Sequence, residues 1–333
     1  MIPEAKQEAV ARALREAFGV TEFEDIRMMT AGLSSALKFR VVVRGCPYLL
    51  RIILRTDAIS DPTLHFACMQ AAAEAGIAPR VWYAGIPERI AITDFVEARP
   101  FPRDEALARL PLTLQTLHRL PPVPRVIHTF DMVEGFHRTF VAAKILPESE
   151  TAELFERYAR AAEVYPRDGS EMVACHNDLK PENVLFDGDR FWLVDWEAAF
   201  MNDRYADLAL VANFVVTDEA EEDAYLRAYF GKPAGEYRRA RFHLMQQALH
   251  MAYAMFLLVL GSRGKPIEWK ANAADFRDFH DRILAGAVDL ADDAMKLEYG
   301  RVHLNRALQD MRAARFEGAL RVVSNRGESQ FMT

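Results

Sequence analysis

The fold of this chain is decided by one stretch, Cys175-His176-Asn177-Asp178-Leu179-Lys180-Pro181-Glu182-Asn183-Val184-Leu185-Phe186. Within it, Asp178 and Asn183 lie five residues apart, and Asp195 follows Asn183 by twelve residues. A carboxylate in such a set can orient a hydroxyl and accept its proton, and the other two side chains offer oxygen ligands for magnesium. These are the requirements of phosphoryl transfer.

The residues after Asn183 predict a β-hairpin. Val184-Leu185-Phe186 is typical of a short strand, Asp187-Gly188 of a hairpin turn, and Phe191-Trp192-Leu193-Val194 of the return strand. Neighbouring strands lie about 5 Å apart, so the outer ends of the hairpin come together. We therefore expect Asn183 and Asp195 to meet around one metal ion. The alternative is a surface turn with ordinary polar ends.

The composition favours a two-lobed protein of a reducing compartment. With 333 residues, the chain exceeds the size at which a single core stops growing. A net charge of -7 gives no basic field to attract nucleic acid or an anionic membrane. The longest apolar run, 251–260, is too short to span a bilayer, and the three cysteines show no metal-type spacing. We predict a cytoplasmic protein with neither a nucleic-acid nor a membrane partner.

The N-terminal part is predicted to be a helix followed by strands. The helix spans 4–18 and the strands span 27–30, 37–43 and 48–54. In the loop at 31–35, Ser34 and Ser35 are candidates to lie over phosphates with their hydroxyls and backbone N–H groups. An ordinary hairpin loop is the alternative. Arg51 interrupts an apolar strand, so it either faces water or has a buried task.

A hinge is predicted near residue 97. A helix at 63–75 and a strand at 89–95 precede Val96-Glu97-Ala98-Arg99-Pro100, where charge and a proline arrive together. We place the N-terminal lobe at 1–97 and a helical C-terminal lobe at 98–333. Its helices are predicted at 105–120, 130–146, 151–164, 203–215, 218–229, 237–260 and 275–316, the last broken near Gly300, before a frayed polar end at 324–333.

Around the quoted stretch the chain resembles the aminoglycoside phosphotransferase and choline/ethanolamine kinase superfamily of small-molecule kinases. The resemblance covers about residues 25–215, in the family's order. It rests on His176-Asn177-Asp178-Leu179-Lys180-Pro181-Glu182-Asn183, Val194-Asp195-Trp196-Glu197, Asn202-Asp203 and Ala206-Asp207-Leu208-Ala209, with support from Leu50-Arg51-Ile52, Gly76-Ile77-Ala78-Pro79, Asp94-Phe95-Val96-Glu97 and Leu117-His118-Arg119-Leu120.

The resemblance implies an α+β, two-lobed, protein-kinase-like fold. A small antiparallel sheet would form the N-terminal lobe, helices would form most of the C-terminal lobe, and ATP would bind in the cleft. The implied roles are Asp178 as catalytic base, Asn183 and Asp195 as ligands of Mg2+, Lys180 as a contact of the transferring phosphate, Arg51 as the cation on the α- and β-phosphates, the backbone of Asp94, Phe95 and Val96 as the adenine site, and His176 and Asp207 as structural residues of the catalytic loop.

The acceptor is predicted to be a small molecule with a hydroxyl. Asp207 follows Asp195 by only twelve residues, which leaves little room for the activation segment of a protein kinase. Trp196 and Glu197 are candidate contacts of the acceptor, together with Asp178. The resemblance favours an amine-bearing acceptor of the choline/ethanolamine- or thiamine-kinase type, although Ala198 stands where eukaryotic choline kinases carry a tyrosine. The alternatives are an aminoglycoside or other antibiotic phosphotransferase and a nucleotide-binding regulator without catalysis.

Three features of the sequence allow more than one interpretation. Kinases pair the strand cation with an acid on the following helix, and the corresponding turn here shows His65 and Gln70, so the partner of Arg51 is open. The acidic run at 218–223 either attracts a cationic substrate or begins a helix. The helices at 275–316 extend past the resemblance and are candidates for a homodimer interface.

Overall fold

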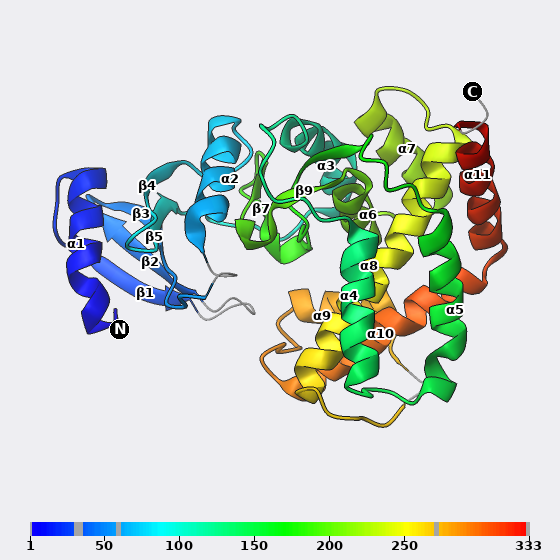
Figure 1. Ribbon diagram of the computed structural model, residues 1–333. Helices are drawn as coiled ribbons and strands as arrows, with labels where there is room; N and C mark the ends of the chain where they lie inside the picture. The colour runs from blue at the N-terminus through cyan, green and yellow to red at the C-terminus, as the bar shows by residue number, and fades with distance from the viewer. Residues whose placement is uncertain (1, 30–35, 58–60, 270–272, 331–333) are drawn as a thin grey trace.

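The computed structural model describes residues 2–29, 36–57, 61–269 and 273–330, and of 326–330 only the backbone. The chain forms two lobes, one built on a sheet and one mainly of helices (Figure 1), which confirms the predicted α+β architecture. The connection between the lobes runs from the end of β5 (Ile90–Asp94) to the start of α3 (Arg103–Leu117). The lobe boundary near residue 97 stays a prediction.

The N-terminal lobe is an antiparallel sheet with α1 (Glu4–Phe18) on one face (Figure 1). Phe39 and Leu50 on that face pack in one cluster with Leu14 of α1. Because side chains alternate along a strand, Lys38 and Arg51 lie on the opposite face. The strand order is β1-β2-β3-β5-β4, with β1 (Asp25–Met29), β2 (Leu37–Val43), β3 (Cys46–Ile52) and β4 (Val81–Gly85).

Helix α2 (Pro62–Glu74) connects the sheet to the C-terminal lobe. Asp61 caps the helix by accepting a hydrogen bond from the N–H of Thr63 at 2.8 Å. Gly76 turns the chain out of the helix with a φ of 73°, a left-handed conformation that glycine adopts without strain. The turn brings the carbonyl of Ile77 to the N–H of Leu193 at 2.8 Å, so the helix is anchored on the hairpin that follows Asn183.

The C-terminal lobe is built around α8 (Glu236–Ser262), which runs through its centre (Figure 1). In the part of the chain that is described, α8 is the one helix long and apolar enough to cross a membrane, and 72% of its apolar window is buried inside the fold. Its apolar side chains are thus accounted for by the core. Around it lie α3, α4 (Thr129–Ala142), α5 (Glu148–Val164), α6 (Tyr205–Val215), α7 (Glu219–Phe230), α9 (Phe276–Leu284), α10 (Asp293–Arg312) and α11 (Ala314–Gln330).

Two details predicted for the C-terminal segment are wrong. The helix expected at 275–316 does not break near Gly300; it breaks after Leu284 and again at Ala313. Gly300 lies inside α10, where an added Cβ would come within 2.6 Å of Cγ of Leu258 on α8, so this glycine allows the two helices to pack closely. The polar end at 324–330 is helical because α11 continues to Gln330. A homodimer through these helices stays a prediction.

Candidate active site

The hairpin predicted after Asn183 is present. β7 (Val184–Phe186) pairs antiparallel with β8 (Phe191–Leu193), and Val184 lies opposite Leu193. Just beyond this pair, the N–H of Val194 donates to the carbonyl of Asn183 at 3.0 Å. Asn183 and Asp195 therefore leave the same end of the hairpin, as a shared metal site requires.

The carboxylate of Asp178 is held by three donors. Lys180 Nζ at 3.0 Å and Asn183 Nδ2 at 2.8 Å both donate to Oδ2. The hydroxyl of Tyr253 on α8 donates to Oδ1 at 2.6 Å. A carboxylate offers about four lone-pair positions. With three of them used by described residues, the remaining one lies on Oδ1, where an incoming hydroxyl can bind.

The side chain of Asp195 faces two cations from the other lobe. Lys38 Nζ lies 3.1 Å from Oδ2, and Arg51 Nη1 lies 3.0 Å from Oδ1. Burial raises the pKa of Asp195, but the charges of Arg51 and Lys38 outweigh burial and hold this pKa far below its usual range. Asp195 therefore stays ionised, which is the state that a metal ligand needs.

Arg51 finds both of its acidic partners in the C-terminal lobe. Its Nη2 donates to Oε1 of Glu197 in the short 3₁₀ turn η3 (Trp196–Ala198), while Nη1 contacts Asp195. Helix α2 contributes His65, not an acid, to the pocket that Arg51 and Asp195 also line. The partner of Arg51 that the sequence left open is therefore the pair Asp195 and Glu197.

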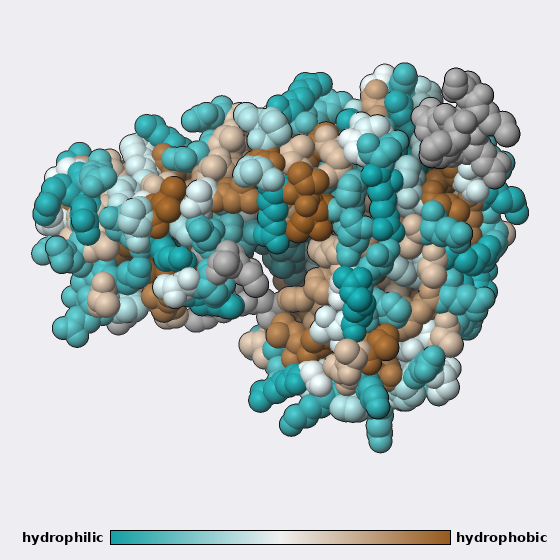
Figure 2. All heavy atoms as spheres, viewed as in Figure 1, coloured by the Kyte–Doolittle hydropathy of each residue, from teal (hydrophilic) through white to brown (hydrophobic). Residues whose placement is uncertain are grey.

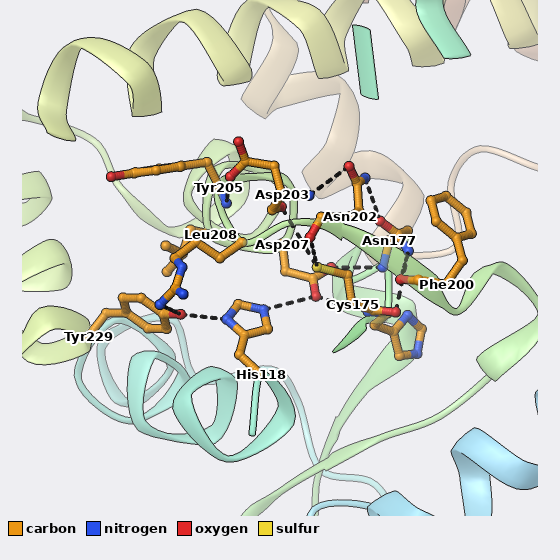
Figure 3. Close-up of polar contacts among 12 residues, drawn as sticks. His118, Cys175, Asn177, Phe200, Asn202, Asp203, Tyr205, Asp207, Leu208 and Tyr229 are labelled. Atoms are coloured by element: carbon orange, nitrogen blue, oxygen red, sulfur yellow. Dashed lines mark hydrogen bonds and ion pairs between the residues drawn. The ribbon is translucent and has the colours of Figure 1, made fainter. Parts of the chain in front are cut away.

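Asp207 on α6 braces the catalytic loop from behind (Figure 3). Its buried carboxylate accepts hydrogen bonds from the N–H of His176 at 2.9 Å, the N–H of Asn177 at 2.7 Å and Nε2 of His118 at 3.2 Å. Burial raises the pKa of Asp207, but the hydrogen bond and charge of His118 more than offset this and lower it. The structural role expected for His176 and Asp207 stays a prediction, to which these contacts give a physical basis.

Asn177 ties the same loop to the strand that follows Asp195 (Figure 3). Its Nδ2 donates to the carbonyls of Ala198 at 3.1 Å and Phe200 at 3.2 Å. That strand, β9 (Phe200–Asp203), pairs with β6 (Met172–Cys175). Together η3 and β9 take up the interval between Asp195 and Asp207, so a protein-kinase activation segment has no room there.

The segment predicted to bind adenine lies at the end of β5. The carboxylate of Asp94 accepts a hydrogen bond from Nε1 of Trp82 at 2.7 Å, so this side chain is already engaged. Phe95 and Val96 are partly exposed, and the guanidinium of Arg40 lies 5.3 Å from the ring centroid of Phe95. Ser34 and Ser35, expected to cover phosphates, lie outside the described residues.

Two residues predicted to contact the acceptor, Trp196 and Glu197, have other partners in the structure. Trp196 is 3% exposed and packs on the ring of His176 with centroids 4.7 Å apart, so it belongs to the core. Glu197 pairs with Arg51. The acidic run at 218–223 begins α7, where Asp218 accepts the N–H of Glu221 at 2.9 Å, which favours the helix-start interpretation.

Lys38 and Tyr253 contact Asp195 and Asp178, and neither is among the site residues predicted from the sequence. Tyr253 sits in a long apolar helix, where an aromatic residue is more often part of the core. For Lys38 a signal was present, because β2 and β3 pair with Lys38 directly opposite Arg51. Because directly opposite residues of paired strands point to the same face, this register places the two cations on one face of the sheet.

Comparison with known proteins places the chain in a family. A profile of the Phosphotransferase enzyme family matches residues 25–243, well over half of the chain. The chain belongs to this family. This assignment to a family of phosphotransferase enzymes agrees with the resemblance noted in the sequence.

Solved structures of other phosphotransferases share the fold. A choline/ethanolamine kinase family protein from Mesorhizobium loti aligns over 96% of this chain and 99% of its own, with a TM-score of 0.69 and 21% identity. The ternary complex of APH(2″)-IIa with streptomycin and ATP aligns over 75% of this chain and 89% of its own, with a TM-score of 0.55 and 12% identity. At these identities the likeness shows the fold alone.

A curated relative matches a shorter segment. Protein LicA from Haemophilus influenzae is 32% identical over 75 residues, which make up 22% of this chain and 28% of LicA. The chain thus matches less than a third of the length of this relative.

Proposed function

We propose that this phosphotransferase uses MgATP to phosphorylate a hydroxyl on a small, amine-bearing molecule. The observation that carries the proposal is the carboxylate of Asp178, which three donors orient and which keeps one lone-pair position on Oδ1. A hydroxyl bound at that position transfers its proton to Asp178 as it attacks the γ-phosphate.

The neighbouring cations supply positioning and charge. Lys180 Nζ, 3.0 Å from Asp178, is placed to neutralise charge on the transferring phosphoryl group. Arg51 has a forked guanidinium fixed by two acids, and this planar group suits nucleotide phosphates. Orientation and charge neutralisation, together with the proton transfer to Asp178, account for catalysis in this class of reaction.

The donor set of Asn183 and Asp195 fits a magnesium ion, which prefers oxygen ligands. Asn183 directs its amide nitrogen to Asp178, which leaves its amide oxygen for a metal. Oδ1 of Asp195 is buried and accepts no hydrogen bond from the described residues, since its contact with Arg51 is an ion pair. When bound, the ion would neutralise charge on the phosphates.

The ring of Tyr253 beside Asp178 supports an amine-bearing acceptor. Tyr253 is partly exposed, and its ring stacks on the buried ring of His303 with centroids 5.4 Å apart. Aromatic faces attract ammonium groups. The likeness to a choline/ethanolamine kinase family protein agrees with this acceptor. The streptomycin–ATP complex keeps aminoglycosides as the second candidate acceptors.

A screen for ADP release over simple alcohols, amino alcohols, sugars and aminoglycosides tests the proposal. We expect an amino alcohol to stimulate ADP release by the wild-type protein and not by Asp178→Ala. Stimulation by aminoglycosides alone would assign the antibiotic class. ATP binding without ADP release on any acceptor would contradict the proposal and favour a nucleotide-binding regulator.

A further inference from the structure

Two cations of the N-terminal lobe hold one carboxylate of the C-terminal lobe. Lys38 on β2 and Arg51 on β3 are directly paired in the sheet register, and each lies about 3 Å from a different oxygen of Asp195: 3.1 Å for Lys38 and 3.0 Å for Arg51. The side chains are largely sheltered, with 21% exposure for Lys38 and 13% for Arg51. Figure 2 shows a hollow between the two lobes.

The two cations differ in the number of acidic partners that the structure gives them. Arg51 also pairs with Glu197, so its guanidinium keeps a partner if Asp195 turns to a metal ion. Within the described ranges, Asp195 is the one acid at ion-pair distance from Lys38. A divalent cation bound to Asp195 would repel the ammonium of Lys38 and remove its counter-charge, and a sheltered cation without a partner is costly.

We propose that Lys38 is a second phosphate-binding cation, which exchanges Asp195 for phosphate oxygens when a magnesium–nucleotide complex binds. Lysine suits this exchange because its ammonium is a point charge on a flexible four-carbon stem, whereas the fork of Arg51 is fixed. A magnesium–nucleotide complex remains negatively charged, and because Arg51 is already paired with Glu197, the ammonium of Lys38 supplies positive charge that Arg51 does not. The inference rests on the proposed function, since it assumes that a nucleotide binds here.

In the competing interpretation, Lys38 only pairs with Asp195 and competes with the metal ion for this carboxylate. The two interpretations predict opposite signs. If Lys38 binds phosphate, its removal weakens the binding of MgADP. If it only occupies Asp195, its removal leaves MgADP binding unchanged or makes it tighter.

Calorimetric titration of the full chain with MgADP and with adenosine distinguishes them. We expect Lys38→Met to weaken MgADP binding about tenfold or more, because a charge-assisted contact is lost, and to leave adenosine binding unchanged. Lys38→Arg keeps the charge and should recover most of the affinity. Lys6→Met is the matched control, because Lys6 lies in the same lobe and donates to the carbonyl of Glu88 at 2.6 Å; it should bind both ligands as the wild type does.

Three results of these titrations would overturn the proposed role of Lys38. Wild-type affinity for MgADP in Lys38→Met, or tighter binding, overturns the role of Lys38 and leaves the proposed function intact. Equal weakening of MgADP and adenosine would also overturn it, since that pattern reports damage to the lobe. A wild-type protein that binds no MgADP would overturn both this inference and the nucleotide part of the proposed function. Lys38→Arg serves as the second variant if Lys38→Met fails to fold.

Discussion

The hydroxyl of Tyr253 donates a 2.6 Å hydrogen bond to Oδ1 of Asp178, across 75 residues of sequence. Burial and the nearby charge of Asp178 raise the pKa of Tyr253 well above its usual value, so the phenol stays protonated and acts as a donor. This bond occupies one of the two lone-pair positions of Oδ1. Tyr253 thereby defines the direction from which an acceptor hydroxyl can approach the base.

Removal of this hydroxyl should slow turnover without affecting the fold. We predict that Tyr253→Phe lowers kcat about tenfold and leaves the KM for ATP unchanged, because a hydrogen bond to a charged group is worth about 1.5–3 kcal/mol. Steady-state kinetics with the best acceptor of the screen measures both constants. Tyr299→Phe is the control in the same aromatic cluster, since its hydroxyl bonds His280 Nδ1 at 3.1 Å and not Asp178. Equal kcat values in all three proteins would remove Tyr253 from the positioning of the base.

Even the conservative substitution Arg51→Lys should weaken nucleotide binding. A lysine keeps the charge but has no fork that reaches Asp195 and Glu197 together. We predict that Arg51→Lys weakens MgADP binding about tenfold and that Arg51→Ala weakens it further. The exposed Arg55, which pairs with Asp57 at 2.7 Å, provides the control variant Arg55→Lys. Calorimetry that finds wild-type affinity in Arg51→Ala would place Arg51 outside the nucleotide site.

Asp207 should matter for stability more than a surface acid does. Asp207→Ala leaves the buried N–H of His176 and the part-buried N–H of Asn177 without an acceptor, which should lower the free energy of unfolding by about 2–5 kcal/mol. Asp223 pairs with Arg239 at 2.8 Å, and both are nearly half exposed. Asp223→Ala should therefore cost less than about 1 kcal/mol. Urea unfolding compares the two variants, and similar losses would argue against the bracing role.

Acid should destabilise the C-terminal lobe through buried histidines. Burial lowers the pKa of His243 and His250 to about 3 and of His280 to about 4, whereas an unfolded histidine titrates near 6.5. Above about pH 6.5 both states are neutral and the full stability is present. Below it the unfolded state binds protons that the folded state excludes, so the free energy of unfolding falls from about pH 6.5 toward pH 4.

Urea unfolding at a series of pH values measures this dependence. The variant His243→Gln cannot titrate and should show a shallower decline by about one proton. A wild-type profile that is flat between about pH 6.5 and pH 4.5 would contradict the prediction.

The catalytic loop could be predicted because its constraints are local. Strand-forming residues around Asp187-Gly188 encode a two-stranded hairpin, and Gly188 has the positive φ, 105°, that such a turn needs. The short interval from Asp195 to Asp207 is also visible in the sequence, and the structure fills it with η3 and β9.

Contacts between distant segments could not be predicted in the same way. Lys38 and Asp195 are 157 residues apart, and their contact depends on how the two lobes are docked, which no periodicity encodes. The direction of the Trp196 side chain could not be predicted either, although Trp196 directly follows Asp195 in the sequence. Asp195 takes a left-handed φ of 70°, and the ring that follows packs on His176 inside the core. A residue type alone does not reveal this change of direction.

The measurement that tests the central claim most directly is ADP release by the wild-type protein and by Asp178→Ala, with MgADP affinity determined for both. The account predicts that kcat falls by about 10²–10⁴-fold, the usual contribution of a positioned base, while MgADP binds equally well to both proteins. Turnover by Asp178→Ala at the wild-type rate would contradict the account.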